Sequence, residues 1–176
     1  MSRHPSPTPS NRAKGSPNLE LKRPVRVVIA ASEMAPFAKT GGLADVAGAL
    51  PDALVGQGAE VRCFIPGYRS VLERCSRLQE ALPGFSVPLG HDRLAVSVLE
   101  GRTEKGTPVH IVQREDLFDR PNLYGTSVQD YYDNLERFTV FSHAVLQTTA
   151  ALEFDPDILH CHDWQTGLIP ALLQGS

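Results

Sequence analysis

One turn in this chain has the composition of an anion-binding site. It follows the apolar run Val25–Ala31, and its residues are Lys39, Thr40, Gly41, Gly42 and Leu43. The two glycines leave backbone N–H groups bare, a helical pattern that begins at Leu43 brings the positive end of its dipole, and Lys39 adds a full charge. Such a turn attracts a phosphate or diphosphate. The alternative is an ordinary strand-to-helix turn in which the lysine is solvated and glycine only permits a positive φ.

A second polar cluster follows a short apolar run near the end of the sequence, at His160, Cys161, His162, Asp163 and Trp164. Two histidines two residues apart can ligate a metal, and His beside Asp suits acid–base chemistry. We expect no metal, because the chain offers no obvious further ligand, and we expect His160 to be a hydrogen-bonded core residue. Asp163 either orients a sugar hydroxyl or caps the helix that follows. Trp164 either stacks on a sugar or fills the core.

The elements that position these residues begin with a strand, a helix and a strand. Val25–Ala31 is continuously apolar, which indicates a strand buried on both faces. Pro51 should kink or end the following helix locally, Gly56 and Gly58 should stop it, and Ala59–Ile65 forms the next strand. The apolar face of the helix is expected at Leu43, Val46, Leu50 and Leu54.

The later pattern predicts shorter strands at Phe85–Pro88, Leu94–Glu100 and Pro108–Val112, the last two joined by a hairpin turn over Gly101–Thr107. A long helix then spans residues 128–152. We expect its buried side to carry Tyr131, Leu135, Phe138, Val145 and Leu152.

On the exposed side of that helix, Asp133 and Arg137 are spaced as an i,i+4 ion pair. A short buried strand at Ile158–Cys161 and a helix over residues 165–174 complete the pattern. Strands that alternate with helices predict an α/β fold with an open, mainly parallel, doubly wound Rossmann-like sheet. Ligands bind such sheets where the strand order reverses, beyond the carboxyl ends of the strands. If their strands are neighbours there, the turn Lys39–Gly42 and the segment His162–Trp164 face one cleft.

Bulk composition excludes several classes of function. The chain of 176 residues is 41% hydrophobic and 21% charged, which suits one globular domain or part of a larger one. A formal net charge of −3 argues against nucleic-acid or anionic-membrane partners. No apolar run approaches the roughly 18 residues that a membrane span needs. The three cysteines, Cys63, Cys75 and Cys161, suit a reducing cytosol, and Cys161 is expected to be buried and inert.

Residues 1–24 differ from the rest of the chain. They contain five prolines, four serines and five Lys or Arg, with no acidic residue before Glu20. The segment has too few apolar side chains for their burial to offset the conformational entropy lost on ordering. We therefore predict a disordered, Ser/Pro-rich basic tail. The main prediction for localisation is the cytoplasm, and a plastid address is the alternative.

Four segments resemble, in order and approximate spacing, the signature motifs of bacterial glycogen synthases and plant starch synthases. The first runs from Ala31 to Pro51 and contains the glycine turn, and the last, Asp157–Leu168, carries the pattern His-x-His-Asp-Trp. Between them lie Phe118–Pro121 and Tyr132–Phe138. The resemblance covers about residues 25 to 174.

This resemblance implies a retaining glycosyltransferase that moves glucose from ADP-glucose to the non-reducing end of an α-1,4-glucan. It implies no cofactor and no metal if fixed protein charges stabilise the leaving diphosphate. Residues 25–176 would be the incomplete N-terminal Rossmann-like part of a two-domain GT-B enzyme. The second domain, with most nucleotide contacts, would be absent, so we expect the isolated chain to be inactive.

The resemblance also assigns roles to particular residues. Lys39 matches the lysine that neutralises the donor phosphates and Asp163 an aspartate close to the transferred glucose, so these two are the predicted catalytic residues. Gly41 and Gly42 would contact the diphosphate through their backbone, and Asp45 borders the donor site unless it only favours the first turn of its helix. The expected sugar-binding residues are Tyr124, Asn134, His162 and Trp164.

Two rival functions come from other classes. One is a non-catalytic glucan- or nucleotide-binding α/β module. The other is a dehydrogenase-like domain, which is disfavoured because no acidic residue stands at the end of Ala59–Ile65 to bind a ribose.

Overall fold

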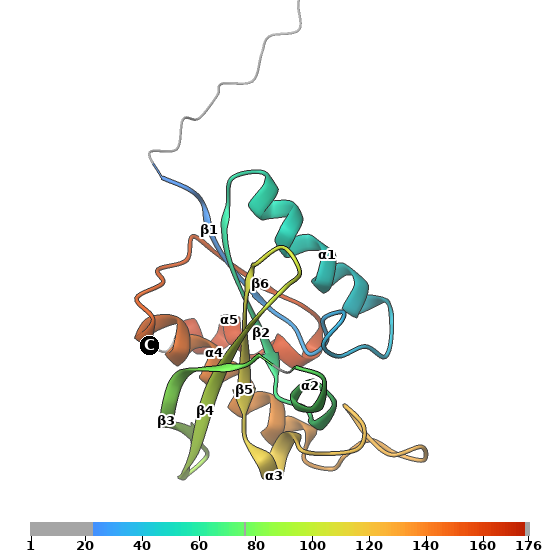
Figure 1. Ribbon diagram of the computed structural model, residues 1–176. Helices are drawn as coiled ribbons and strands as arrows, with labels where there is room; N and C mark the ends of the chain where they lie inside the picture. Colours follow the sequence, from blue (N-terminus) through green and yellow to red (C-terminus); the bar gives the residue numbers. More distant parts are fainter. Residues whose placement is uncertain (1–22, 76, 175–176) are drawn as a thin grey trace, which may run out of the picture.

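The computed structural model describes residues 23–75 and 77–174, which form a six-stranded sheet with helices packed on it (Figure 1). The strands are β1 (Arg26–Ala30), β2 (Glu60–Pro66), β3 (Gln79–Leu89), β4 (Asp92–Arg102), β5 (Pro108–Gln113) and β6 (Ile158–Cys161). The helices are α1 (Gly42–Gly56), α2 (Arg69–Arg74), α3 (Glu115–Phe118), α4 (Asn134–Ala151), the 3₁₀ helix η1 (Trp164–Thr166) and α5 (Ile169–Leu173).

The strand order is β3-β4-β5-β2-β1-β6, and it places the point of reversal between β1 and β6. β1 pairs in parallel with both β2 and β6, and β2 pairs in parallel with β5. β4 and β3 are antiparallel additions at one side. The predicted doubly wound, mainly parallel sheet is therefore confirmed, and so is the hairpin that joins β4 to β5.

Helix α1 packs closely on the loop after β1, and its buried face differs from the predicted one. Its buried residues are Ala44, Ala47 and Pro51, whereas Val46, predicted on the apolar face, is 55% exposed. The small buried side chains let the backbone approach the loop: a Cβ on Gly48 would stand 2.6 Å from the carbonyl oxygen of Ala35. The helix also does not end at the proline. It continues through Pro51 to Gly56.

Two predictions about the segment before and within α4 are wrong. The helix begins at Asn134 rather than near residue 128, and Leu135 is 70% exposed. Arg137, expected on the exposed side, is fully buried, and Asp133 forms its ion pair with Arg120 instead, at 2.5 Å. Helical spacing alone cannot reveal this, because the competing partners come from the irregular segment between α3 and α4.

Strand β6 has the predicted bounds but not the predicted burial. Ile158 is 50% exposed and His160 is also exposed, because in the described part of the chain β6 pairs on one side only, with β1. Cys161 is half-buried, and this partial burial raises the pKa of its thiol.

The predicted disordered tail lies outside the described residues except for its last two, of which Arg23 forms an ion pair with Asp157 at 2.7 Å. Among the helices of the described residues, none is both long and apolar enough to cross a membrane.

Candidate functional site

The two motif-bearing loops leave neighbouring strands at the same edge of the sheet. Ala30 at the end of β1 is in register with Cys161 at the end of β6, and the His162 amide donates to the Ala30 carbonyl at 3.0 Å. The loop that begins at Ala31 and the segment that begins at His162 therefore start side by side at the point of strand reversal, where open α/β sheets bind ligands.

Tyr124 connects the loop after β1 to the segment before α4. Its hydroxyl lies 2.7 Å from the Ser32 hydroxyl and donates to Glu33 Oε1 at 2.7 Å. Burial is the main cause that raises the pKa of Tyr124, and the negative charges of Glu33 and Asp163 raise it further. The phenol of Tyr124 thus stays protonated and remains a hydrogen-bond donor to Glu33.

The glycine turn is open on its outer side. A Cβ built on Gly41 or on Gly42 would meet nothing within 4 Å. Neither residue has a positive φ: Gly41 is the N-cap of α1 in an extended conformation, with φ −147° and ψ −163°, and Gly42 is the first helical residue. Neither packing nor backbone strain within the described chain therefore requires glycine here. The open space leaves room for a ligand to approach the backbone closely at these two residues.

On its inner side the turn is held by Glu33, to which the sequence patterns assigned no definite role. Glu33 is only 4% exposed. Its carboxylate accepts hydrogen bonds from the Thr40 amide at 2.5 Å, the Thr40 hydroxyl at 2.6 Å and the Gly41 amide at 3.2 Å. Burial opposes ionisation, but these bonds and the one from Tyr124 together hold the pKa of Glu33 below its usual value. The sequence signal that could have revealed this role is the position of Glu33, a carboxylate a few residues before a turn whose amides need acceptors.

The bonds to Glu33 divide the amides of the turn into two sets. The amides of Thr40 and Gly41 point inward to the carboxylate. Those of Gly42 and Leu43 belong to the first turn of α1, where backbone N–H groups have no partner within the helix. An anion at this turn would therefore meet Gly42 and Leu43 first.

Lys39 lies beside the open side of the turn and forms an ion pair with Asp45, at 2.5 Å. Both side chains are more than half exposed, at 51% and 59%. An exposed pair of this kind contributes about 1 kcal/mol or less, so Lys39 is free to turn to a stronger anion. Asp45 stands in the first turn of α1, where its charge also favours the helix dipole.

Asp163 has a strained backbone. Its φ of 64° and ψ of −178° place it in a region that is essentially restricted to glycine, at a cost of roughly 1–3 kcal/mol. Its Oδ1 accepts a hydrogen bond from the Trp164 amide at 2.7 Å and so caps η1. The predicted alternative of a cap is therefore present in the structure. It occupies one carboxylate oxygen, and the exposed side chain has a second.

The two histidines stack on each other. Their ring centroids are 4.3 Å apart with an angle of 11° between the planes. His160 is exposed, so the expectation of a core histidine is wrong; β6 is half-exposed, and residues two apart in a strand share a face. Nε2 of His162 is buried without a hydrogen-bond partner among the described residues. Burial, helped by His160, lowers the pKa of His162 and favours a neutral ring.

The remaining predicted site residues differ in how accessible they are. Trp164 is 56% exposed and meets Phe138 edge-on, with centroids 5.2 Å apart, so it does not fill the core. Asn134 is 9% exposed. Its amide nitrogen donates to the Tyr124 carbonyl at 2.8 Å, and its oxygen accepts from Arg137 at 2.6 Å. Both polar atoms of the Asn134 side chain are thus bonded to other residues of the chain.

A cavity of about 1160 Å³ lies elsewhere, between α2, α3 and the strands β4 and β5, and it contains none of the predicted site residues. Charged side chains from α2 and from the α3 region line it: Arg69, Glu73, Arg114, Glu115, Asp116 and Asp119. The predicted site residues instead lie in the loop after β1 and the first turn of α1, in the segment after β6, and in the segment that ends at the start of α4.

Comparison with known proteins gives the family. The family model described as the starch synthase catalytic domain matches residues 26–176. The chain belongs to this family. The resemblance read from the four motifs is therefore confirmed.

Individual relatives agree with this assignment. The chain is 47% identical over 150 residues to a glycogen synthase of Syntrophotalea carbinolica, covering 85% of the chain and 31% of that protein. It is 43% identical to a glycogen synthase of Koribacter versatilis, with 85% and 30% covered. The fold is similar to the catalytic domain of starch synthase IV from Arabidopsis thaliana bound to ADP and acarbose, with a TM-score of 0.71, 33% identity, and 86% and 30% covered. The chain thus spans about 30% of the length of these relatives.

Proposed function

We propose that this chain forms part of a glycogen or starch synthase, which transfers glucose from ADP-glucose to the non-reducing end of an α-1,4-glucan with retention. The observation that supports the proposal most is the open glycine turn at the start of α1, in a loop that begins beside the segment that contains Asp163. Two supports come from the comparisons: the curated relatives are glycogen synthases, and the Arabidopsis starch synthase is bound to ADP and acarbose. We propose no cofactor, a cytoplasmic location, and a plastid as the alternative.

In this proposal the start of α1 stabilises the leaving diphosphate. The amides of Gly42 and Leu43 belong to the first turn of α1, where they have no partner within the helix and the dipole is positive, and Lys39 adds a mobile positive charge. Charge grows on the diphosphate as its bond to glucose breaks. Fixed dipoles and a lysine at that position lower the barrier without a proton transfer, which is electrostatic catalysis. Asp45 would border this donor site and hold Lys39 until the donor arrives.

The segment after β6 would hold the sugar. Asp163 offers a carboxylate oxygen to a glucose hydroxyl, and the unpartnered Nε2 of His162 offers a second polar contact. Trp164 presents an exposed aromatic face, which suits stacking on a sugar ring. Tyr124 donates to Glu33 in the loop after β1 and Asn134 donates to the Tyr124 carbonyl, so these two residues would support that loop.

A chimera tests the proposal. Residues 25–174 replace the matching segment of the Syntrophotalea carbinolica glycogen synthase, and incorporation of labelled glucose from ADP-glucose into glycogen is measured. We expect transfer by the chimera and a loss of about a hundredfold or more in the Lys39→Ala chimera, as for removal of one electrostatic stabiliser. We expect no transfer by the 176-residue chain alone.

Three outcomes contradict the proposal. Equal transfer by the chimera and its Lys39→Ala variant would remove the donor role of the turn. Transfer by the isolated chain would show that no second half of the site is needed. A folded chimera that binds ADP or maltooligosaccharide without turnover would favour the non-catalytic binding module.

A further inference from the structure

Arg137 is a buried charge without a carboxylate partner. Its side chain is fully buried, and no carboxylate of the described residues lies within ion-pair distance of it. Nη2 has no hydrogen-bond partner in the described part of the chain. The guanidinium lies instead over aromatic rings, 5.0 Å from the centre of Tyr131 and 5.3 Å from that of Phe138. A buried, unpaired charge is costly, so its remaining contacts must be the reason it is tolerated.

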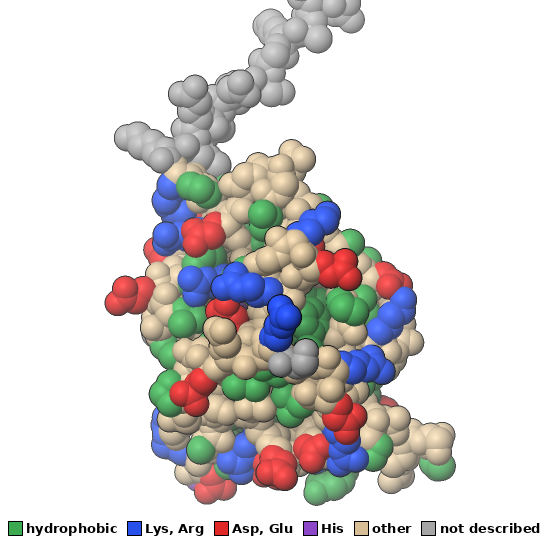
Figure 2. Space-filling model, viewed as in Figure 1, with side chains coloured by type: hydrophobic (Ala, Val, Ile, Leu, Met, Phe, Trp, Pro, Cys, Tyr) green, Lys and Arg blue, Asp and Glu red, His purple; other side chains and the backbone are tan. Residues whose placement is uncertain are grey.

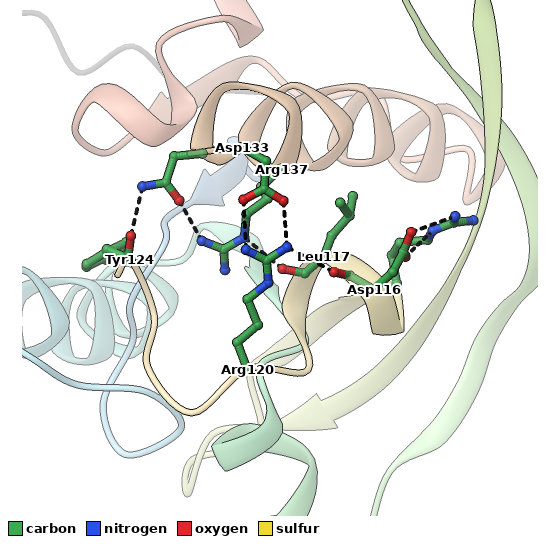
Figure 3. A network of polar contacts seen from close by, with 8 residues as sticks. Asp116, Leu117, Arg120, Tyr124, Asp133 and Arg137 are labelled. Atoms are coloured by element: carbon green, nitrogen blue, oxygen red, sulfur yellow. Dashed lines mark hydrogen bonds and ion pairs between the residues drawn. The ribbon is translucent and has the colours of Figure 1, made fainter. Parts of the chain in front are cut away.

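Those contacts tie α3 to the start of α4 (Figure 3). Nε donates to the carbonyl of Leu117 at 2.7 Å, and Nη1 donates to Oδ1 of Asn134 at 2.6 Å. A hydrogen bond from a charged donor is stronger than one between neutral groups. Arg137 therefore fixes the orientation of the Asn134 amide, including which face its NH₂ group presents.

Asn134 passes this constraint to Tyr124. Its Nδ2 donates to the Tyr124 carbonyl at 2.8 Å, and the ring of Tyr124 packs near Phe138 with centroids 6.1 Å apart. The hydroxyl at the far end of the same side chain donates to Glu33. Tyr124 thus bridges two elements: its backbone carbonyl accepts from Asn134 in α4, and its hydroxyl donates to Glu33 in the loop after β1.

Glu33 completes the connection to the glycine turn through its bonds from the amides of Thr40 and Gly41. We propose that Arg137 is a positioning residue for this turn, acting through Asn134, Tyr124 and Glu33, a chain of contacts called the relay below. The relay keeps the amides of Thr40 and Gly41 turned inward and thereby leaves those of Gly42 and Leu43 facing out. Its effect on diphosphate binding rests on the proposed function, but its effect on the turn does not.

The competing explanation is that Arg137 only stabilises the packing of α3 against α4 and has no effect on the turn. Asn134→Asp separates the two explanations, because aspartate is nearly the same shape. Its carboxylate still accepts from Arg137 and gains a charge pair, so the packing of α3 against α4 is kept. It has no NH₂ group, so the bond to the Tyr124 carbonyl is lost and two oxygens face each other.

The readout is hydrogen exchange of the Thr40 and Gly41 amides in the full chain, followed by ¹⁵N NMR without ligand. Loss of one hydrogen bond in the relay should speed both exchange rates by about tenfold. We expect this in Asn134→Asp and in Arg137→Gln. Arg137→Lys, which keeps the charge and can reach one of the two acceptors, should restore part of the protection.

Arg120→Gln is the matched control. It breaks the neighbouring ion pair between Arg120 and Asp133, whose side chains are 19% and 11% exposed, respectively. It removes no hydrogen bond of the relay. It should lower the melting temperature and leave both exchange rates unchanged. If Arg137→Gln does not fold, Asn134→Asp decides alone. Unchanged exchange in Asn134→Asp, or equal acceleration in Arg120→Gln, overturns the proposal.

Titration with ADP separates failure of the relay from failure of the proposed function. We expect ADP to bind about tenfold more weakly to the chimera with Asn134→Asp than to the unmodified chimera that carries residues 25–174. If the unmodified chimera does not bind ADP but the exchange rates differ as expected, the relay stands and the donor site falls. If ADP binds both proteins equally and exchange is unchanged, the donor site stands and the relay is wrong.

Discussion

Substitution of Asp163 tests whether its strained backbone is maintained for function. Asp163→Ala removes the carboxylate but keeps a Cβ in a region that favours glycine. Asp163→Gly removes the carboxylate and relieves the strain. Both variants lose the hydrogen bond from the Trp164 amide. The difference between them therefore reports the strain and not the lost cap.

The magnitude follows from three terms. Relief of strain at φ 64° and ψ −178° favours the glycine variant by roughly 1–3 kcal/mol. Glycine also gives the unfolded chain more conformational freedom, which reduces the advantage of the glycine variant by about 0.4–1 kcal/mol. Loss of the cap costs both variants about 1 kcal/mol. We expect Asp163→Gly to be more stable than Asp163→Ala by about 1–2 kcal/mol, or roughly 3–6 °C in melting temperature.

Urea unfolding and thermal melts measure the difference, and Glu153 provides the control. Glu153 also has a positive φ, 51°, but follows the C-terminus of α4, where a left-handed residue is ordinary. Its Gly and Ala variants should differ by less than the Asp163 pair. Both Asp163 variants should lose transfer in the chimera. The reasoning is refuted if Asp163→Gly is no more stable than Asp163→Ala.

Two further predictions concern stability. Burial lowers the pKa of His110 to about 4, so the folded state favours the neutral ring and the unfolded chain binds the proton. Stability should fall as the pH drops from about 6.5 towards 4, by about 2–3 kcal/mol at pH 4.5, and His110→Phe, which keeps the stack on Phe64, should lose this share of the acid sensitivity in urea titrations. Gly48→Ala would place a Cβ 2.6 Å from the Ala35 carbonyl and should cost about 1–3 kcal/mol. Gly56→Ala meets nothing within 4 Å and should be near neutral; an equal loss in both would show that α1 does not press on the loop.

The sheet was predictable because local patterns determine it. The continuous apolar run of β1, the glycines after α1 and the hairpin turn between β4 and β5 each specify their element without distant contacts. The pairing of β1 with β6 was only a condition of the sequence prediction, and the structure meets it: the loop after β1 and the segment after β6 begin side by side.

The errors arose where tertiary partners compete with local spacing. Arg137 and Asp133 have ideal spacing for a helical ion pair, but their partners are Leu117 in the short helix α3 and Arg120 just after it. His160 was expected in the core because Ile158–Cys161 was predicted to be a short buried strand, whereas His160 is exposed. Glu33 was given no definite role because its four hydrogen bonds depend on Tyr124 and on the fold of the turn.

Titration of the ¹⁵N-labelled chain with ADP tests the central claim most directly, because the two sets of amides in the turn give separate signals. The account predicts saturable shifts of the Gly42 and Leu43 amides, with smaller shifts at Thr40 and Gly41, and weaker binding in Lys39→Ala. Shifts confined to other surfaces, or binding that is unchanged in Lys39→Ala, would contradict the claim that a diphosphate binds where α1 begins.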